Sequence, residues 1–238
     1  MQGRSATTWI TYGLIAVVLA APVAAWWWSV GDPSIYFTHD LPAGQGLYAF
    51  AKLAGLLGFA LLWVQALLGM APRVPSFRGL PVISRSAHIG LGCGAAMLIA
   101  AHVGLFVAGS SLRKKTVAWE LLLPNLDHGY YFQMITLGAV ALYLLVIALF
   151  AGWRLRRGHR RWKAIHMLWP AVFALALVHS ITIGSESRYG VLVYVFFFMG
   201  SSLALIALAR TATWLGARRA KAAIARNGSK LASDASTH

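Results

Sequence analysis

The sequence predicts an all-α integral membrane protein built as a six-helix transmembrane bundle. Apolar residues make up 59% of the 238 residues and charged residues only 11%, whereas charged residues make up about 25% of an ordinary soluble domain. The apolar residues gather in six runs, each near the roughly 20 residues that a helix needs to cross the hydrocarbon core. Short connections between the runs favour one compact bundle. We therefore expect a single domain over residues 1–238, with a spanning core at about 9–209.

The six runs differ in the residues that they carry. The first ends in three tryptophans, which are enriched at membrane interfaces, and it is longer than a usual signal-peptide core, so we expect a retained helix. The second carries Gln65, whose amide is expected to bond to a neighbouring helix. The third is rich in glycine and alanine, which is typical of close helix packing. The expected spans are Trp9–Trp28, Tyr48–Met70, Ser86–Ala108, Tyr131–Ala151, Lys163–Ile183 and Gly190–Ala209.

The net charge of +15 is unevenly distributed along the chain. Lysines and arginines gather between runs two and three, between runs four and five, and after run six, which all lie on one side of a six-span bundle. By the positive-inside rule this side is cytoplasmic and holds both termini, so we expect a multi-pass protein of the bacterial inner membrane. Residues 210–238 would form a basic cytoplasmic tail with an interfacial helix and a disordered end. The basic residues on this side include Arg73, Arg78, Arg85, Arg154, Arg156, Arg157, Arg160, Arg161, Lys163, Arg218, Arg219, Lys221 and Arg226.

Several function classes lack their sequence signatures. Membrane topology accounts for nearly all of the positive charge, so nucleic acid is not expected as a partner. The chain has no G-x-G-x-x-G fingerprint, no P-loop and no room for a nucleotide-binding domain. The single cysteine, Cys93, excludes an intrachain disulfide, a C-x-x-C redox motif and the C-x-x-C-H signature of covalently attached haem.

Four histidines in two of the runs are the candidate functional residues. The third run holds His88 and His102, and the fifth run holds His166 and His179. A histidine inside the membrane is unfavourable unless it faces the bundle interior and has a partner, so each pair indicates a functional site. Separations of 14 and 13 residues correspond to roughly 20 Å along each helix. Each run therefore has one histidine toward each membrane face.

The four histidines are expected to form two pairs at two depths. Both runs cross the membrane outward from the cytoplasmic side, so His88 lies level with His166, and His102 with His179. Two level imidazole pairs are what two haems need when each iron takes one axial ligand from each helix. At about 100° per residue, His88 and His102 share one helix face, whereas His166 and His179 lie about 140° apart on an ideal helix. A kink at Pro170 would bring His166 and His179 to a common face.

Basic residues near the two levels are candidates for contacts with haem propionates. Arg85 and Arg161 are expected on the inner side, and Arg113 and Lys114 on the outer side. Each of these residues also fits as a charge that only sets the topology. The outer connection over residues 109–130 would cover the outer site, receive a partner, or serve only as a connection.

The paired histidines with spacings of 14 and 13, together with the fragment W-K-A-I-H from Trp162, resemble the transmembrane domain of ferric reductases and NADPH oxidases. The resemblance covers residues 9–209 and implies two non-covalent b-type haems stacked between the third and fifth helices. His88 and His166 would hold the inner haem, and His102 and His179 the outer one. Family members usually continue into flavin and nicotinamide domains, and this chain stops after the sixth helix. It therefore resembles the stand-alone bacterial members, including the membrane subunit of the periplasmic methionine sulfoxide reductase system.

The expected function is electron transfer from a cytoplasmic or membrane donor to an acceptor on the periplasmic side. The donor would be a separate flavoprotein that docks on the basic 152–163 loop, around Arg156, Arg157 and Arg160, or a membrane quinol. A flavin would sit on that partner or at the cytoplasmic side. The acceptor would be a periplasmic protein, a ferric chelate or another small molecule. Three alternatives stay open: a haem-binding subunit of a periplasmic reductase complex, a proton-coupled transporter with a histidine relay, and a structural or assembly subunit.

Overall fold

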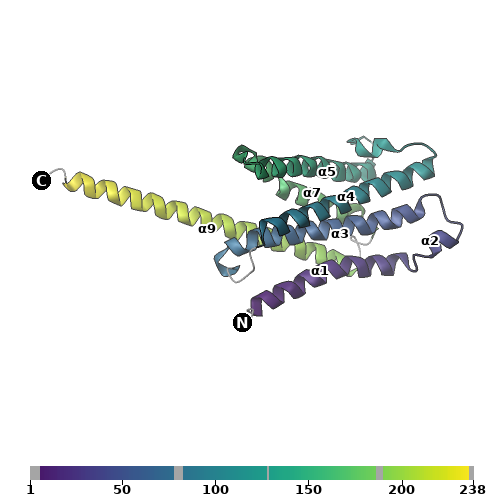
Figure 1. The fold of residues 1–238 in the computed structure, drawn as a ribbon, viewed down its shortest axis with the longest axis horizontal. Helices are drawn as coiled ribbons and strands as arrows, with labels where there is room; N and C mark the ends of the chain where they lie inside the picture. Colours follow the sequence, from purple (N-terminus) through teal and green to yellow (C-terminus); the bar gives the residue numbers. More distant parts are fainter. Residues whose placement is uncertain (1–5, 78–82, 128, 186–189, 236–238) are drawn as a thin grey trace.

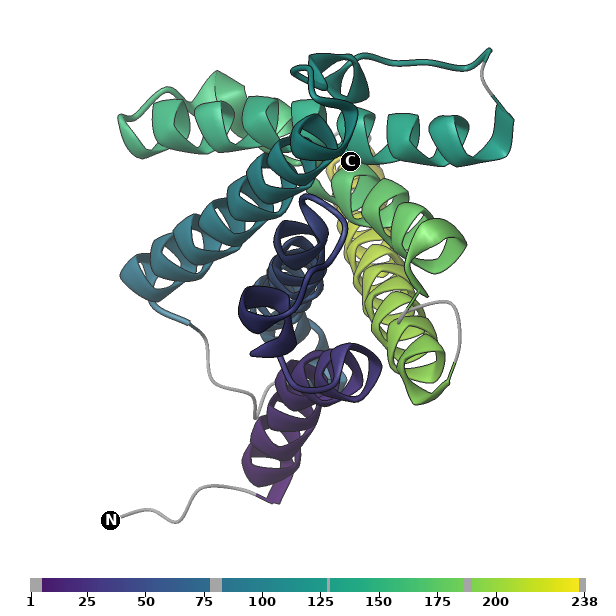
Figure 2. The same cartoon turned by 90° about the vertical axis from the view of Figure 1, so that its right-hand side faces the viewer.

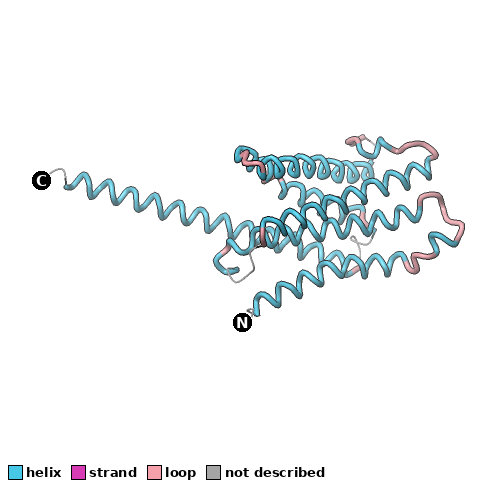
Figure 3. Tube along the Cα trace, in the orientation of Figure 1, coloured by secondary structure: helices cyan, strands magenta, loops and turns pink. Residues whose placement is uncertain are grey.

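Each apolar run forms a helix because a helix satisfies the N–H and C=O groups of its own backbone, which lipid does not. The computed structural model describes residues 6–77, 83–127, 129–185 and 190–235. Over these ranges the chain consists of helices, loops and turns, without a β-strand (Figure 3). Six helices in this part of the chain are long and apolar enough to cross a membrane. The six predicted spans are confirmed, and the protein is a multi-pass membrane protein.

The spanning helices alternate in direction (Figure 1), and all but the fifth span, which has the predicted bounds, are longer than the predicted runs. They are α1 (Ala6–Val30), α3 (Gln45–Met70), α4 (Arg85–Lys114), α5 (Gly129–Arg156), the divided fifth span α6 (Lys163–His166) and α7 (Trp169–Ile183), and α9 (Val191–Ala235). Short elements in the connections are α2 (Ile35–Thr38), η1 (Ala71–Arg73), η2 (Pro75–Phe77), η3 (Trp119–Leu122) and η4 (Arg160–Trp162). Both described chain ends lie at the end of the bundle that carries η1, η2 and η4, as the predicted topology requires.

Two helical hairpins form the part of the bundle that carries the histidines. One hairpin pairs α3 with α4, and the other pairs α5 with α6 and α7. Helix α3 lies between α1 and α5, as the views from the side and from one end agree (Figures 1 and 2). Because α1 and α9 also pack on α3, this helix is the centre of the molecule.

The main apolar core surrounds α3 and joins the first hairpin to α7 and α9. The Phe59 ring stacks on Phe173 of α7 with centroids 4.7 Å apart and meets Phe196 of α9 edge-on at 5.1 Å. Trp63 is buried, and its indole Nε1 donates a hydrogen bond of 3.0 Å to Ser202 Oγ on α9. These contacts hold α7 and α9 against α3, and they set the distance between the two hairpins.

The fifth span is divided between α6 and α7, which bears out the effect expected of Pro170. Pro170 has no N–H to donate to the carbonyl four residues earlier. Around it the backbone winds more tightly, with Leu168 N donating to Ile165 O at 3.0 Å and Ala171 N to Leu168 O at 2.9 Å. His166 therefore ends the short α6, while His179 lies in α7.

Helix α9 differs from the prediction for the chain end. It continues without interruption for 45 residues, to Ala235, and its last part projects away from the bundle (Figure 1). The predicted helix after the span is therefore present and continuous with it, and the predicted disordered end is wrong up to Ala235. The stretch after the span is rich in alanine, lysine and arginine and has no proline, and such residues extend a helix readily. Arg78, predicted on the cytoplasmic side, lies outside the described residues.

Candidate functional site

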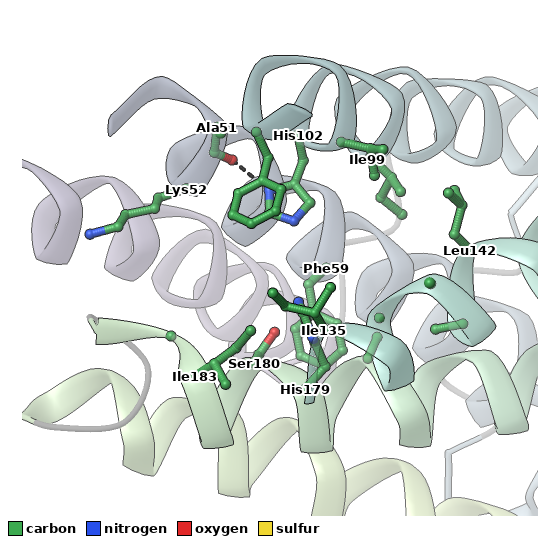
Figure 4. A pocket seen from close by; sticks show the side chains of 18 of the residues that line it. Ala51, Lys52, Phe59, Ile99, His102, Ile135, Leu142, His179, Ser180 and Ile183 are labelled. Carbon is green, nitrogen blue, oxygen red and sulfur yellow. Dashed lines mark hydrogen bonds between the residues drawn. The ribbon is translucent and has the colours of Figure 1, made fainter. Parts of the chain in front are cut away.

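A cavity of about 220 Å³ lies between the two hairpins toward the outer end of the bundle. His102 of α4 and His179 of α7 point into it from opposite sides (Figure 4). Most of the remaining lining is apolar and comes from α3, α4, α5 and α7, and Leu121 and Leu122 of η3 close part of its outer end. The outer connection thus covers this cavity, which was one of the three roles considered for it.

The two outer histidines are held in the same way. His102 Nδ1 lies 2.8 Å from the carbonyl oxygen of Ala51 on α3, and His179 Nδ1 lies 2.8 Å from that of Met134 on α5. A carbonyl oxygen only accepts hydrogen bonds, so Nδ1 carries the proton in each ring, and Nε2 keeps its lone pair. A neutral imidazole with a bonded Nδ1–H and a free Nε2 is the form in which histidine ligates a metal.

The inner pair consists of His88 and His166, which lie 14 and 13 residues before His102 and His179. The rings of His88 and His166 face each other edge-on with centroids 6.4 Å apart. Two metal–nitrogen bonds of about 2.0 Å on opposite sides of an ion place two imidazole centroids roughly 6 Å apart. His166 Nδ1 donates to the carbonyl oxygen of Ala148 on α5 at 3.0 Å, which leaves its Nε2 as the free nitrogen. The separation of this pair therefore fits one metal ion held between two rings.

The hydrogen bonds also show that the divided fifth span directs His166 and His179 toward the same helix. His166 and His179 would lie about 140° apart on an ideal helix. Both nonetheless donate to carbonyls of α5, which are fourteen residues apart on that helix. The break before α7 therefore turns both rings toward the same neighbouring helix.

Three of the histidines share one arrangement, which we call a carbonyl–glycine seat: a helix carbonyl that accepts from Nδ1, and a glycine four residues later that makes room for the ring. A Cβ atom built on Gly55 would lie 2.7 Å from the His102 ring, and one on Gly138 would lie 2.7 Å from the His179 ring. A Cβ on Gly152 would lie 3.1 Å from the His166 ring. The seats are Ala51/Gly55, Met134/Gly138 and Ala148/Gly152.

His88 does not follow this arrangement. The corresponding positions on α3, fourteen residues after Ala51 and Gly55, are Gln65 and Gly69. The Gln65 side chain lies against His88, with its amide nitrogen 3.3 Å from Nε2, 3.5 Å from Nδ1 and 3.3 Å from the His88 carbonyl oxygen. The expected bond from Gln65 to a neighbouring helix is therefore confirmed, and its partner is one of the four histidines.

The basic residues considered for propionate contacts lie at different places around the two levels. Arg113 and Lys114 line a smaller cavity next to the outer one, where Arg113 Nη2 donates to Gln45 Oε1 at 2.7 Å. Arg85 Nη2 donates to the carbonyl oxygen of Arg156 at 3.1 Å, joining α4 to the end of α5. Arg161 is exposed on η4. The structure thus places Arg113 and Lys114 at a cavity that shares lining residues with the outer one, while Arg85 bonds to a backbone carbonyl and Arg161 is exposed.

Lys114 also pairs with Glu120 of η3. The hydrogen bond from the Lys114 ammonium holds the pKa of the Glu120 carboxyl below its ordinary value of 4.5. This ion pair ties the end of α4 to the segment that carries Leu121 and Leu122 over the outer cavity.

Several residues of the site are not predicted from the sequence. Lys52 lines the outer cavity and donates to Ser185 Oγ at 2.7 Å. The three seats were also missed, although the sequence does hold a signal for them. Glycines recur at a spacing of fourteen on two helices, the same spacing as His88 and His102. They are Gly55 and Gly69 on α3, and Gly138 and Gly152 on α5.

The histidine pairs have a donor set that suits haem. Across the described residues no three His, Cys, Asp or Glu side chains gather in a group that would hold a bare metal ion. A porphyrin supplies four nitrogens to its iron, so two opposed imidazoles complete the coordination. At three of the four histidines, a glycine on the neighbouring helix makes room for the ring beside the carbonyl that accepts from it. The residues therefore fit a macrocycle at the outer level, where His102 and His179 line one cavity, and the separation of the inner rings fits one metal ion between them.

Comparison with known protein families gives one match. The family model described as "Ferric reductase like transmembrane component" matches residues 54–177, slightly more than half of the chain. The matched range includes His88, His102 and His166 and ends two residues before His179. Searches of curated proteins and of solved structures found no match to this chain.

Proposed function

Because this chain belongs to the family of ferric reductase-like transmembrane components, we propose that it transfers electrons across the membrane through two non-covalent b-type haems. One would be held by His88 and His166, the other by His102 and His179. The observation that carries the proposal is the pairing itself: two histidines 6.4 Å apart at the inner level, and two that enter one cavity from opposite sides at the outer level.

The chain's own residues support this function in three ways. The carbonyls of Ala51, Met134 and Ala148 hold Nδ1–H, so Nε2 is the nitrogen left to bind iron. The apolar lining excludes water, which favours electron exchange over reaction with solvent. Lys52, Arg113 and Lys114 are proposed for the outer propionates, and Arg85 and Arg161 for the inner ones. When bound, the haems supply the reversible one-electron couple of their iron.

The first test is the haem content of the purified protein. We expect two haems per chain and the sharp reduced bands of b-type haem in the visible spectrum after dithionite. His102→Ala or His179→Ala should remove the outer haem and leave the inner one. One haem or fewer per fully loaded wild-type chain would contradict the proposal, as would equal loss of both components in a stably inserted His102→Ala variant.

The hydrogen bonds also bear on the transporter alternative. A proton relay needs histidines that exchange protons at both ring nitrogens. In three of the four rings, Nδ1 donates to a helix carbonyl, and a carbonyl cannot pass a proton on. These rings are therefore suited to binding a metal through Nε2 and not to relaying protons. A visible spectrum without haem bands in well-folded protein would favour the transporter or the assembly subunit instead.

We further propose that the donor is an acidic cytoplasmic flavoprotein that docks beside the inner haem. Arg156, Arg157 and Lys163 are exposed on the connection between α5 and α6, close in sequence to His166. Arg157 also lies over the Trp153 ring, at 4.2 Å from its centroid, so part of its role is to pack on that ring. A surface of this charge raises the rate at which an acidic partner associates. The acceptor would lie on the periplasmic side, and both termini in the cytoplasm of a bacterial cell.

The charge of this surface can be tested separately from the haem site. The double variant Arg156→Gln with Lys163→Gln should slow the reduction of the haems by a candidate flavoprotein at low salt. The difference in rate between this variant and the wild type should shrink as ionic strength rises. Arg219→Gln with Lys221→Gln, on the projecting part of α9, removes the same charge away from the loop and serves as the control. If the first variant keeps both haems and is reduced at the wild-type rate at low salt, a membrane quinol becomes the better donor.

A further inference from the structure

Gln65 separates His88 from the three other histidines. An atom that lies 3.3 Å from one ring nitrogen and 3.5 Å from the other cannot lie along the lone pair of either, because those two directions diverge. The Gln65 amide therefore does not fix which nitrogen of His88 carries the proton. In the other three rings, a backbone carbonyl fixes the proton on Nδ1.

The sequence of α3 repeats the carbonyl and glycine positions of a seat at the level of His88. A seat at this level would consist of the Gln65 backbone carbonyl and Gly69, in register with Ala51 and Gly55 fourteen residues earlier. A Cβ atom built on Gly69 would have no atom within 4 Å. The Gln65 amide instead lies toward α4, where a Cβ on Gly92 would come within 2.9 Å of its nitrogen. Gly92 thus makes room for the amide at His88.

We infer that Gln65 is a positioning residue that keeps His88 out of a fourth carbonyl–glycine seat, and that His88 is therefore a ligand that a small neutral molecule such as carbon monoxide replaces. This inference rests on the proposed function, since it concerns the iron of the inner haem. A hydrogen bond from Nδ1–H to a carbonyl orients the ring and strengthens the ligand, and loss of such a bond typically weakens metal binding about 10- to 100-fold. His88 lacks that bond, so it is the weakest of the four ligands.

The exchange involves only coordination bonds. The bond between the iron and His88 Nε2 breaks, and a bond between the iron and the carbon of carbon monoxide forms. The iron stays ferrous, and no proton or electron is transferred. His166 would keep its hydrogen bond to Ala148 and remain a ligand.

Titration of the dithionite-reduced, full-length protein with carbon monoxide tests the inference. In the wild type we expect one of the two haems to bind carbon monoxide and the other to remain unreactive. Gln65→Ala gives this position the residue found in the seats at Ala51 and Ala148. His88 should then donate to the backbone carbonyl of residue 65, and the affinity for carbon monoxide should fall about tenfold or more.

Three further variants distinguish the seat from a general change in packing. Gly69→Ala should bind carbon monoxide as the wild type does, because its Cβ meets open space. Gln65→Ala with Gly69→Ala should return to wild-type binding, because the new Cβ fills the seat as it would at Gly55. Gln65→Leu keeps the bulk without the amide and should also bind as the wild type does. If Gln65→Ala fails to insert, loss of binding in Gly69→Ala or Gln65→Leu still overturns the inference.

A redox titration gives a second signature. A carbonyl-bonded ligand stabilises ferric iron, so Gln65→Ala should lower the midpoint potential of the inner component and leave the outer one unchanged. Two haems with no carbon monoxide binding in the wild type, or with equal binding in wild type and Gln65→Ala, would overturn the inference alone. One haem or fewer in the wild type would contradict the proposed function, and the haem count shows which has failed.

Discussion

At the scale of single residues, the glycines of α3 and α5 matter for the space that they leave. Gly55, Gly138 and Gly152 each lie one helical turn after a carbonyl that accepts from a histidine. A methyl group at any of them would lie 2.7 to 3.1 Å from an imidazole atom, closer than packed atoms normally approach. The ring would have to leave the carbonyl, and its Nε2 would turn away from the opposite histidine.

Gly138→Ala should therefore weaken the outer haem site selectively. We expect haem affinity at that site to fall about 10- to 100-fold, because the ring orientation and the Nδ1 hydrogen bond are lost together. Haem content and the outer component of a redox titration measure the effect. Gly104→Ala is the control, since a Cβ there meets no atom within 4 Å. Equal haem content in the two variants would show that the carbonyl–glycine seat at Gly138 is not needed for haem binding.

At the scale of elements, the division between α6 and α7 determines where His166 and His179 point. Pro170→Ala restores the missing N–H and favours a continuous helix through the fifth span. The two rings would then diverge toward about 140°, so one of them would lose its carbonyl on α5.

We expect Pro170→Ala to insert normally and to lose one haem, which the reduced spectrum and haem count would report. Pro22→Ala is a matched control, because Pro22 also lies inside a spanning helix but on α1, which carries no candidate ligand. Two haems and an unchanged spectrum in Pro170→Ala would mean that packing against α5, and not the proline, maintains the break.

The segment η3 should respond to acid through Glu120. The pKa of Glu120 is lowered by its hydrogen bond with Lys114, so the contribution of this pair is complete above pH 4.5 and is lost as pH falls through the lower, folded-state pKa. Hydrogen-exchange protection factors for Leu121 and Leu123, whose N–H groups bond within η3, should fall in acid. Glu120→Gln should show low protection at every pH; a wild-type pH profile in this variant would rule the pair out.

The elements differ in how far the sequence predicts them. Six spans follow from hydropathy, because lipid requires long apolar helices whatever their partners are. The break at Pro170 follows from a missing N–H, which is also a local property. The long α9 was missed because the basic composition of its end suggested an interfacial helix, while helix propensity continued the span outward.

The contacts of the site depend on tertiary structure, so the sequence predicts them less well. The depth of each of the four histidines in the membrane follows from the number of residues that separate it from the nearest basic loop. The choice of carbonyl does not, because it depends on which face of α3 meets α4 and which face of α5 meets α7. Gln65 illustrates the limit: its polarity predicts an interhelical bond, but only packing makes His88 the partner.

At the scale of the whole molecule, both described chain ends lie at the end of the bundle that carries the basic loops (Figure 1). The positive-inside rule then predicts a cytoplasmic C-terminus. Green fluorescent protein fused after the last residue should fluoresce, and alkaline phosphatase at the same place should be inactive. Alkaline phosphatase inserted after Asn125, in the connection before α5, should be active. The reverse pattern would invert the membrane orientation and move the proposed donor to the other side.

The two-hairpin architecture has a consequence for the amount of this protein that a cell contains. Helix α4 packs chiefly on α3, and α7 chiefly on α5, so a cofactor between them would join two halves that otherwise meet mainly through α3. A ligand that binds only the folded form stabilises it by mass action, and a membrane protein that opens more often is degraded sooner. Cells starved of haem precursors should therefore contain less of this protein at an unchanged level of its messenger RNA, so that its abundance reports on haem supply.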